Sequence, residues 1–265
     1  MSAVVVERPW RGAREALRAT FFLAGREIRN ILRTPAAFIP SMIIPLFFYF
    51  VQSASLSKLA GGAIGGNGDY RAFVLPVSLM FAMSNEGAGM NLVIDIERGY
   101  FDKLLLSPAS RMSLLVGAMG ANIARILFVG TVVTTIALAA GVHFATGIGG
   151  AVLMVLLASM WGIAYAAVGM GIALKTGNAQ ATQASFIAVF PLLFLTTSFA
   201  PRGVLSPWLQ RAVGYNPLTY LLGALRAFSV TGWSAHDIVL GVLAVSGVGL
   251  LTVTLAFRAL AGRLK

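Results

Sequence analysis

Cysteine is absent from this 265-residue chain, and charged residues make up only 11% of it. Without cysteine the chain has no disulfide, no thiol nucleophile and no thiolate metal site. A soluble domain of this size carries about 25% charged residues, whereas 58% of this chain is hydrophobic and its mean hydropathy is +0.84. This composition excludes an ordinary soluble domain and predicts an all-α protein that crosses a membrane several times.

Catalytic motifs are lacking as well. No phosphate-binding G-x-x-x-x-G-K-S/T loop occurs, because Lys175-Thr176 lacks the preceding glycines. His143 and His236 stand alone without ligand spacing around them, and no serine, histidine and carboxylate set converges. We therefore expect a protein that is not an enzyme and has no catalytic residue, metal or cofactor of its own. A pump without a nucleotide site needs a partner subunit that has one.

Six apolar stretches are candidates for membrane spans, each of which needs about 20 residues. They are residues 36–56, 72–94, 108–142, 150–174, 184–199 and 237–260. Prolines 40 and 45 are expected to kink the first span, and small residues such as Gly89 and Gly169 allow close helix contact. Residues 143–149 read as a short external turn and residues 175–183 as a polar inner loop. We predict a six-helix transmembrane domain over residues 36–262, preceded by a cytoplasmic region over residues 1–35.

Basic residues set the expected orientation of these spans. The net charge of +11 does not indicate nucleic acid, because the basic residues lie in predicted loops and tails. Fourteen of them fall on one side of the predicted layout and five on the other. The positive-inside rule then places both termini in the cytoplasm. The polar stretch from Glu7 to Arg18, with no short apolar core after it, gives no sign of a signal peptide.

A charged stretch, DIERGYFDKLLLSPASR at residues 95–111, separates the second and third spans. Its charges cannot cross a bilayer core cheaply, whereas its apolar residues, three or four positions apart, line one side of a short helix. That side fits a groove on a soluble partner; the alternative is an ordinary cytoplasmic loop with one amphipathic turn. The candidate coupling residues are Glu97, Arg98, Gly99, Tyr100, Phe101, Leu104 and Leu105.

An amphipathic helix is predicted over residues 13–33. Its apolar stripe includes Phe21, and arginines 18, 26, 29 and 33 fall on the opposite side. This pattern is typical of a helix on the surface of a membrane, where arginines meet anionic headgroups. A soluble helix packed on a partner is the alternative. The candidate residues are Arg18, Phe21, Arg26 and Arg29.

Residues 201–226 are too apolar for a solvent loop and too rich in proline for a full span. Pro207 is expected to start one short helix and Asn216-Pro217 another, as a cap followed by proline at the first helical position. Trp208, Tyr215, Tyr220 and Trp233 suit interfacial depth. The candidate residues of this hairpin are Pro201, Pro207, Trp208, Asn216, Pro217 and Tyr220.

Three further features have an open role. Glu86 in the second span and Arg125 in the third are expected to reach a similar depth and pair, either as a strut or as a gate. Aromatic residues gather at 47–50, as an interfacial belt or a lipid-facing entrance. Phe186, Phe190 and Phe194 recur at helical spacing, for packing or for binding.

The order of these features resembles the type-2 ABC exporter permeases over essentially the whole chain. The resemblance rests on an acidic residue and E-R-G at 95–99, followed by S-P and a basic residue, and on N-P-L-T-Y followed by an arginine at 216–226. It implies an interfacial elbow helix at the N-terminus and a cytoplasmic coupling helix between the second and third spans. It also implies an external re-entrant hairpin, residues 200–228, between the fifth and sixth.

The resemblance also implies partners. Two permease copies, as a homodimer or with a sister permease, would work in the cell membrane with two ABC ATPase subunits that hold ATP and Mg²⁺. The chain looks most like the daunorubicin-type drug exporters, whose amphipathic substrates would enter from the inner leaflet. A permease for lipid-linked glycans is the alternative. A secondary transporter would need charges gathered at the membrane midplane, where only Glu86 and Arg125 qualify.

Overall fold

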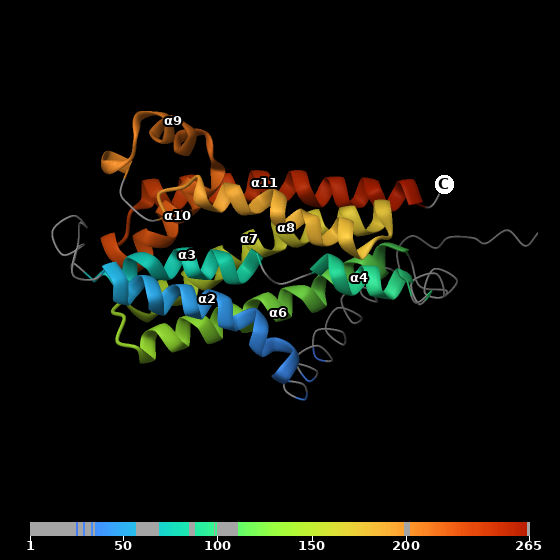
Figure 1. Ribbon diagram of the computed structural model, residues 1–265, viewed down its shortest axis with the longest axis horizontal. Coiled ribbons are helices and arrows are strands. Elements are labelled where there is room, and N and C mark those ends of the chain that lie inside the picture. Colours follow the sequence, from blue (N-terminus) through green and yellow to red (C-terminus); the bar gives the residue numbers. More distant parts are fainter. Residues whose placement is uncertain are drawn as a thin grey trace, which may run out of the picture.

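The computed structural model describes residues 25, 29, 33, 35–56, 69–84, 88–97, 99, 111–198 and 202–263. These residues form helices and connecting turns, with no strand among them. Most helices run along the long axis of the molecule (Figure 1). The α-helices are α2 (Pro35–Leu56), α3 (Tyr70–Ser84), α4 (Ala88–Glu97), α6 (Arg111–Ala139), α7 (Gly147–Thr176), α8 (Ala179–Phe194), α9 (Pro207–Tyr215), α10 (Pro217–Arg226) and α11 (Ala235–Arg263). A 3₁₀ turn, η2 (Arg202–Val204), and a π turn, η3 (Ala227–Thr231), complete the set.

Three helices in the described part of the chain are long and apolar enough to cross a membrane. They are Asn122–Ala139 within α6, Gly147–Thr176, which is α7, and Ala235–Gly262 within α11. They fall on the predicted third, fourth and sixth spans. Shorter apolar helices fall on the first, second and fifth: Met42–Ser55, Tyr70–Ser84 and Ala179–Phe194. The second span was predicted as one stretch, and the structure describes it as α3 and α4 on either side of residues 85–87.

Helix α3 forms the centre of the bundle. Every residue of α3 except Arg71 is buried, because α2, α6 and α7 all pack against it. By contrast, α11 packs along α7 and α10 and exposes leucines on its other side, among them Leu243, Leu250 and Leu251. A long exposed apolar face of this kind belongs against lipid or a protein partner rather than water.

Glycine allows two of the closest helix contacts. A Cβ atom added at Gly89 of α4 would lie 2.5 Å from the carbonyl carbon of Gly169 in α7. One added at Gly241 of α11 would lie 2.4 Å from Cβ of Ala224 in α10. The predicted role of Gly89 and Gly169 in close helix packing is therefore confirmed, since any side chain at Gly89 would meet the backbone of α7.

The predicted polar inner loop over residues 175–183 is wrong. Helix α7 continues to Thr176, and α8 begins at Ala179. Gly177, with a left-handed φ of 59°, ends α7 by donating its N–H to the carbonyl of Ala173, and the Asn178 side chain accepts from the backbone of Gln180 and Ala181. A glycine that ends one helix and an asparagine that caps the next need only two residues.

The limits of two predicted spans, the fifth and the third, also differ from those of the helices in the structure. The fifth span was predicted over residues 184–199, whereas α8 starts at Ala179, where the Asn178 cap places it, and ends at Phe194. Beyond α8, the hydroxyl groups of Thr196 and Ser198 both donate to the carbonyl of Leu193. Helix α6 ends at Ala139, three residues before the predicted limit, and Gly141 follows with a φ of 89°.

Candidate functional site

The α9–α10 segment, residues 202–231, connects the end of α8 to α11 and lies at one end of the bundle (Figure 1). Its two helices begin at Pro207 and Pro217, the positions at which the sequence predicted helix starts. Proline fits there because the first backbone N–H of a helix has no partner within the helix. Trp208 and Tyr215 are strongly exposed and Tyr220 is partly so, while the Tyr220 hydroxyl donates to the carbonyl of Gly214 and ties α10 to α9.

Asn216 joins this segment to α8. Its side-chain oxygen accepts the backbone N–H of Leu218 at 3.0 Å, which caps α10. Its amide nitrogen donates to the carbonyls of Leu192 and Leu195, each at 2.7 Å. The last carbonyls of a helix have no partner within it, so this buried side chain satisfies the end of one helix and the start of another. The sequence predicted the cap but not the connection to α8.

Arg226, the last residue of α10, reaches across to α3 and to the residues after α8. Its guanidinium lies 3.6 Å from the centre of the Phe73 ring and donates to the Phe73 carbonyl at 3.4 Å. It also donates to the Thr197 hydroxyl at 3.0 Å and to the Ser198 carbonyl at 3.1 Å. From the sequence, Arg226 was expected to be an external positive charge and the arginine that follows N-P-L-T-Y, with no predicted contact. Its acceptors, 28 to 153 residues away in the chain, gave no local signal.

The turn between α6 and α7 is attached to the same end of the bundle. The Thr146 hydroxyl donates to the carbonyl of Phe228 in η3 at 2.7 Å. The Arg71 side chain, at the start of α3, donates to the carbonyl of Ala140 at 2.9 Å. Carbonyls at helix ends and in the π turn are thus satisfied by side chains from other elements.

Four phenylalanines connect α2, α3 and α8, and we call them the aromatic seam: Phe48, Phe81, Phe190 and Phe194. Phe81 stacks on Phe48 with ring centres 5.8 Å apart, and meets Phe190 and Phe194 edge-on at 5.9 Å and 5.6 Å. The aromatic groups of residues 47–50 and of α8, which are far apart in the sequence, therefore meet on α3.

The aromatic seam is partly open at the surface. Phe190 is 37% exposed, and Phe47 and Phe50, on the same helix as Phe48, are exposed as well. Phe73, against which Arg226 packs, precedes Phe81 by about 12 Å along α3 at 1.5 Å per residue. Arg226 and the aromatic seam thus contact α3 at two different levels, through Phe73 and Phe81.

Several predicted site residues lie outside the described residues. They are Arg18, Phe21, Arg26, Glu86, Arg98, Tyr100, Phe101, Leu104, Leu105 and Pro201. Glu97 ends α4 and is exposed, and Gly99 follows in a turn with a φ of 66°. Arg29 is exposed and helical, and Arg125 is half-buried in α6. The coupling helix, the elbow helix and the Glu86–Arg125 pair therefore stay predictions.

The chain belongs to the ABC-2 type transporter family, because residues 18–229 match that family. It is therefore a transport permease subunit and, with its long apolar helices, a multi-pass membrane protein. The resemblance of the sequence to the type-2 ABC exporter permeases is thereby confirmed at the level of the family.

Two relatives make the likeness more specific. The daunorubicin resistance ABC transporter permease protein DrrB1 of Streptomyces coeruleorubidus is 27% identical over 228 residues, which cover 83% of this chain and 77% of the relative. The probable doxorubicin resistance ABC transporter permease protein DrrC of Mycobacterium tuberculosis is 24% identical over 221 residues, which cover 83% of this chain and 80% of the relative.

Proposed function

We propose that this chain is the permease subunit of an ABC exporter that moves an amphipathic, drug-like or lipid-like molecule out of the cytoplasm or inner leaflet. The observation that carries the proposal is the family match over residues 18–229, together with drug-resistance permeases among the relatives. Two permease copies work with two ABC ATPase subunits, which bind ATP and Mg²⁺. The chain itself has no phosphate-binding loop.

The proposed layout has six spans with both termini in the cytoplasm. The grouping of the connections supports it. Ile96, Lys175 and Gly262, from three elements predicted to end on the cytoplasmic side, line one pocket. The α6–α7 turn and the α9–α10 segment, both predicted to be external, are joined by the bond from Thr146 to Phe228. The two groups lie at opposite ends of the bundle (Figure 1).

Substrate passes between the two copies along the aromatic seam. Exposed apolar residues of α2, among them Ile39, Ile43, Phe47 and Phe50, recur at helical spacing, and Phe48 of the same helix belongs to the aromatic seam. When two copies bring such stripes together, they enclose an apolar path with aromatic walls. The α9–α10 segment, held by Asn216 and Arg226, closes the outer end of this path.

ATP hydrolysis in the partner reaches this path through residues 95–111. The apolar side of the coupling segment, with Tyr100 and Leu104, docks in a groove of the ATPase. Movement of the segment is transmitted through α4, which packs on α7 at Gly89. The elbow helix holds the first span at the membrane surface.

Transport into inside-out vesicles tests this proposal. The permease and its ATPase are produced together, and ATP-dependent uptake of fluorescent daunorubicin is measured against vesicles with a hydrolysis-deficient ATPase. We expect uptake only with active ATPase. Phe190→Ser should lower uptake about fivefold, by loss of one aromatic contact, while Leu243→Ser on the exposed face of α11 should leave it unchanged.

The vesicle measurement also gives clear contrary outcomes. Uptake that proceeds equally with the hydrolysis-deficient ATPase would contradict an ABC mechanism. ATP-dependent transport of another amphipathic molecule, with no effect of Phe190→Ser, would keep the permease role and remove the aromatic seam from the path.

A further inference from the structure

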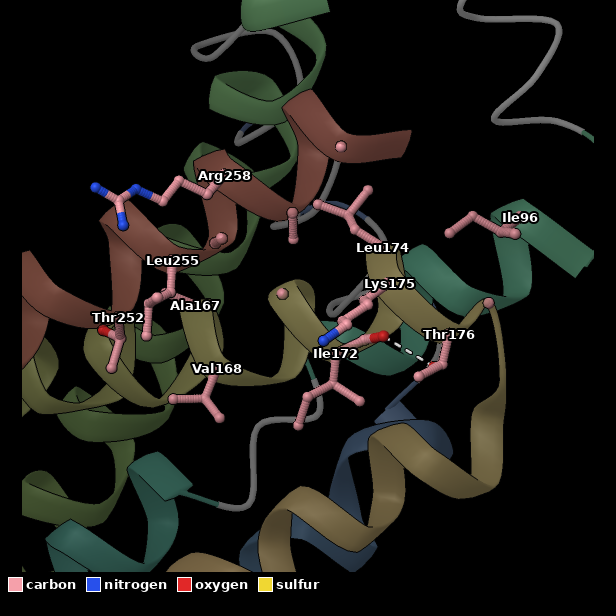
Figure 2. A pocket seen from close by; sticks show the side chains of 15 residues that line it. Ile96, Ala167, Val168, Ile172, Leu174, Lys175, Thr176, Thr252, Leu255 and Arg258 are labelled. Atoms are coloured by element: carbon pink, nitrogen blue, oxygen red, sulfur yellow. Dashed lines mark hydrogen bonds between the residues drawn. The ribbon is translucent and has the colours of Figure 1, made fainter. Parts of the chain in front are cut away.

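A pocket of about 990 Å³ opens between the ends of α7 and α11, far from the aromatic seam. Ile96 at the end of α4 also lines it (Figure 2). The proposed transport path does not use this pocket. The ends of α4 and α11 that line it lie at the end of the bundle opposite the α9–α10 segment (Figure 1).

Small residues explain why this end of the helix pair is hollow. Ala256, Ala259 and Gly262 of α11 line the pocket at a spacing of three, so they share one side of the helix. On α7, Gly171 faces them, and a Cβ atom added there would lie 3.5 Å from Cα of Ala256. The helices touch at Gly171, and the small side chains beyond that contact leave space unfilled.

Two cations, Lys175 of α7 and Arg258 of α11, supply the polar part of the pocket. Both are exposed, and in Figure 2 the Arg258 side chain extends to the left from α11, while the Lys175 side chain lies nearer the centre of the view. The described lining contains no acidic residue. The hydroxyls of Thr176 and Thr252 donate to carbonyls of their own helices, at 2.8 Å and 3.1 Å. Among the described side chains that line the pocket, Lys175 and Arg258 are therefore the hydrogen-bond donors available to an anionic ligand.

The rest of the wall is apolar and continues along the membrane-facing side of α11. Val168 and Ile172 of α7 line the pocket with Leu255 of α11, which is 52% exposed. Leu250 and Leu251, also exposed, carry the apolar surface away from the charges along α11. A pair of cations at one end of a long apolar surface matches a ligand with an anionic head and an apolar tail.

We propose that this pocket binds an anionic phospholipid, with its phosphate held by Lys175 and Arg258 and an acyl chain along α7 and α11. Basic pockets between membrane helices on the cytoplasmic side are suited to such headgroups, and the proposed orientation places this end at the cytoplasmic leaflet. A free phosphate ion has no apolar part that could contact the apolar wall of the pocket, whereas a phospholipid has one. The inference requires a membrane protein but no particular substrate, so its test does not depend on transport.

Native mass spectrometry of the purified chain tests the proposal. The protein in detergent is offered equal amounts of phosphatidylglycerol and phosphatidylcholine with the same acyl chains. We expect selective retention of phosphatidylglycerol, and a loss of that selectivity on the order of tenfold in Lys175→Gln/Arg258→Gln. The matched control is Arg202→Gln/Arg211→Gln, which removes the same charge from exposed positions of the α9–α10 segment and should keep the selectivity.

Two further variants separate charge from shape. Lys175→Arg/Arg258→Lys keeps both charges and should retain phosphatidylglycerol. Val168→Trp keeps the charges but fills the apolar wall, and should lower retention of this lipid. Circular dichroism and gel filtration of each variant establish that it is folded before binding is compared.

Four outcomes would overturn the inference. The first is equal retention of both lipids by the unmodified chain. The second is an equal loss in the control variant. The third is displacement of phosphatidylglycerol by millimolar glycerol phosphate, which would indicate a site for soluble phosphates. The fourth is lost binding of the ATPase, with lipid selectivity unchanged, in Lys175→Gln/Arg258→Gln, which would assign the pocket to the partner subunit.

Discussion

The two halves of the bundle are held together by different chemistry. At the α9–α10 end, the side chains of Arg71, Thr146, Asn216 and Arg226 donate to carbonyls of other elements. Toward the other end, α4 meets α7 at Gly89, where a missing side chain allows contact. Side-chain hydrogen bonds thus connect elements in the first half, beside the glycine contact at Gly241, whereas the contact of α4 with α7 depends on a side chain that is absent. We therefore expect the first half to be sensitive to loss of polar groups, and the α4–α7 contact to be sensitive to added atoms.

The largest effect is expected from Arg226→Met. This change leaves acceptors on Phe73, Thr197 and Ser198 without their donor, and should lower the free energy of unfolding by about 3 kcal/mol. Arg226→Lys should recover only part of the lost stability. It keeps a positive charge, but an ammonium group cannot donate to three acceptors as the planar guanidinium does. Unfolding in SDS measures the difference against Arg211→Met, which lies exposed on α9. Equal stability of Arg226→Met and Arg211→Met would show that the hydrogen bonds of the Arg226 guanidinium do not contribute to the stability of the protein.

A single added methyl group tests the other half. Gly89→Ala places Cβ 2.5 Å from the backbone of Gly169, and should cost about 2 kcal/mol because backbone atoms cannot rotate away. The matched control is Gly247→Ala in α11, where no heavy atom lies within 4 Å; alanine there should stabilise the helix by up to about 1 kcal/mol. Thermal unfolding in detergent compares the two. If both variants gain stability, α4 and α7 are not in close contact.

The smallest loss of stability is expected from substitutions of Asn216, which can separate its cap of α10 from its hydrogen bonds to the end of α8. Asn216→Ser can still cap α10 but cannot reach Leu192 and Leu195, and should cost about 1 kcal/mol. Asn216→Ala should add the loss of the cap, about 1 kcal/mol more. Hydrogen exchange should speed up at the end of α8 in both variants, and at the start of α10 only in the alanine variant. Identical exchange patterns in the two variants would mean that the cap and the connection to α8 act as one unit.

The same contrast explains how far the sequence could predict the structure. Helix starts at Pro207 and Pro217 were predictable because a proline at the first helical position is a local signal, and at Pro217 the capping Asn216 adds a second one. The contact at Gly89 was predictable for a similar reason, since small residues in an apolar helix mark close packing. The Gly177–Asn178 connection was equally local, but polarity alone led to the prediction of a loop.

The remaining features depend on residues far apart in the chain. The place of Arg226 depends on acceptors of α3 and of the residues after α8, and the aromatic seam on three helices. Neither arrangement has a sequence pattern of its own. The pocket between α7 and α11 likewise arises only when small residues on these two helices face each other.

Helix α8 has little mechanical freedom. One end is fixed to α7 by the two-residue connection Gly177–Asn178, and the other to α10 by Asn216. Because both of its ends are attached, α8 cannot move independently of α7 and α10. Helix α2 lies on the other side of the seam and packs mainly on α3. If the distance between Phe48 and Phe190 widens during transport, we expect α2 to move and α8 to stay with α7 and α10.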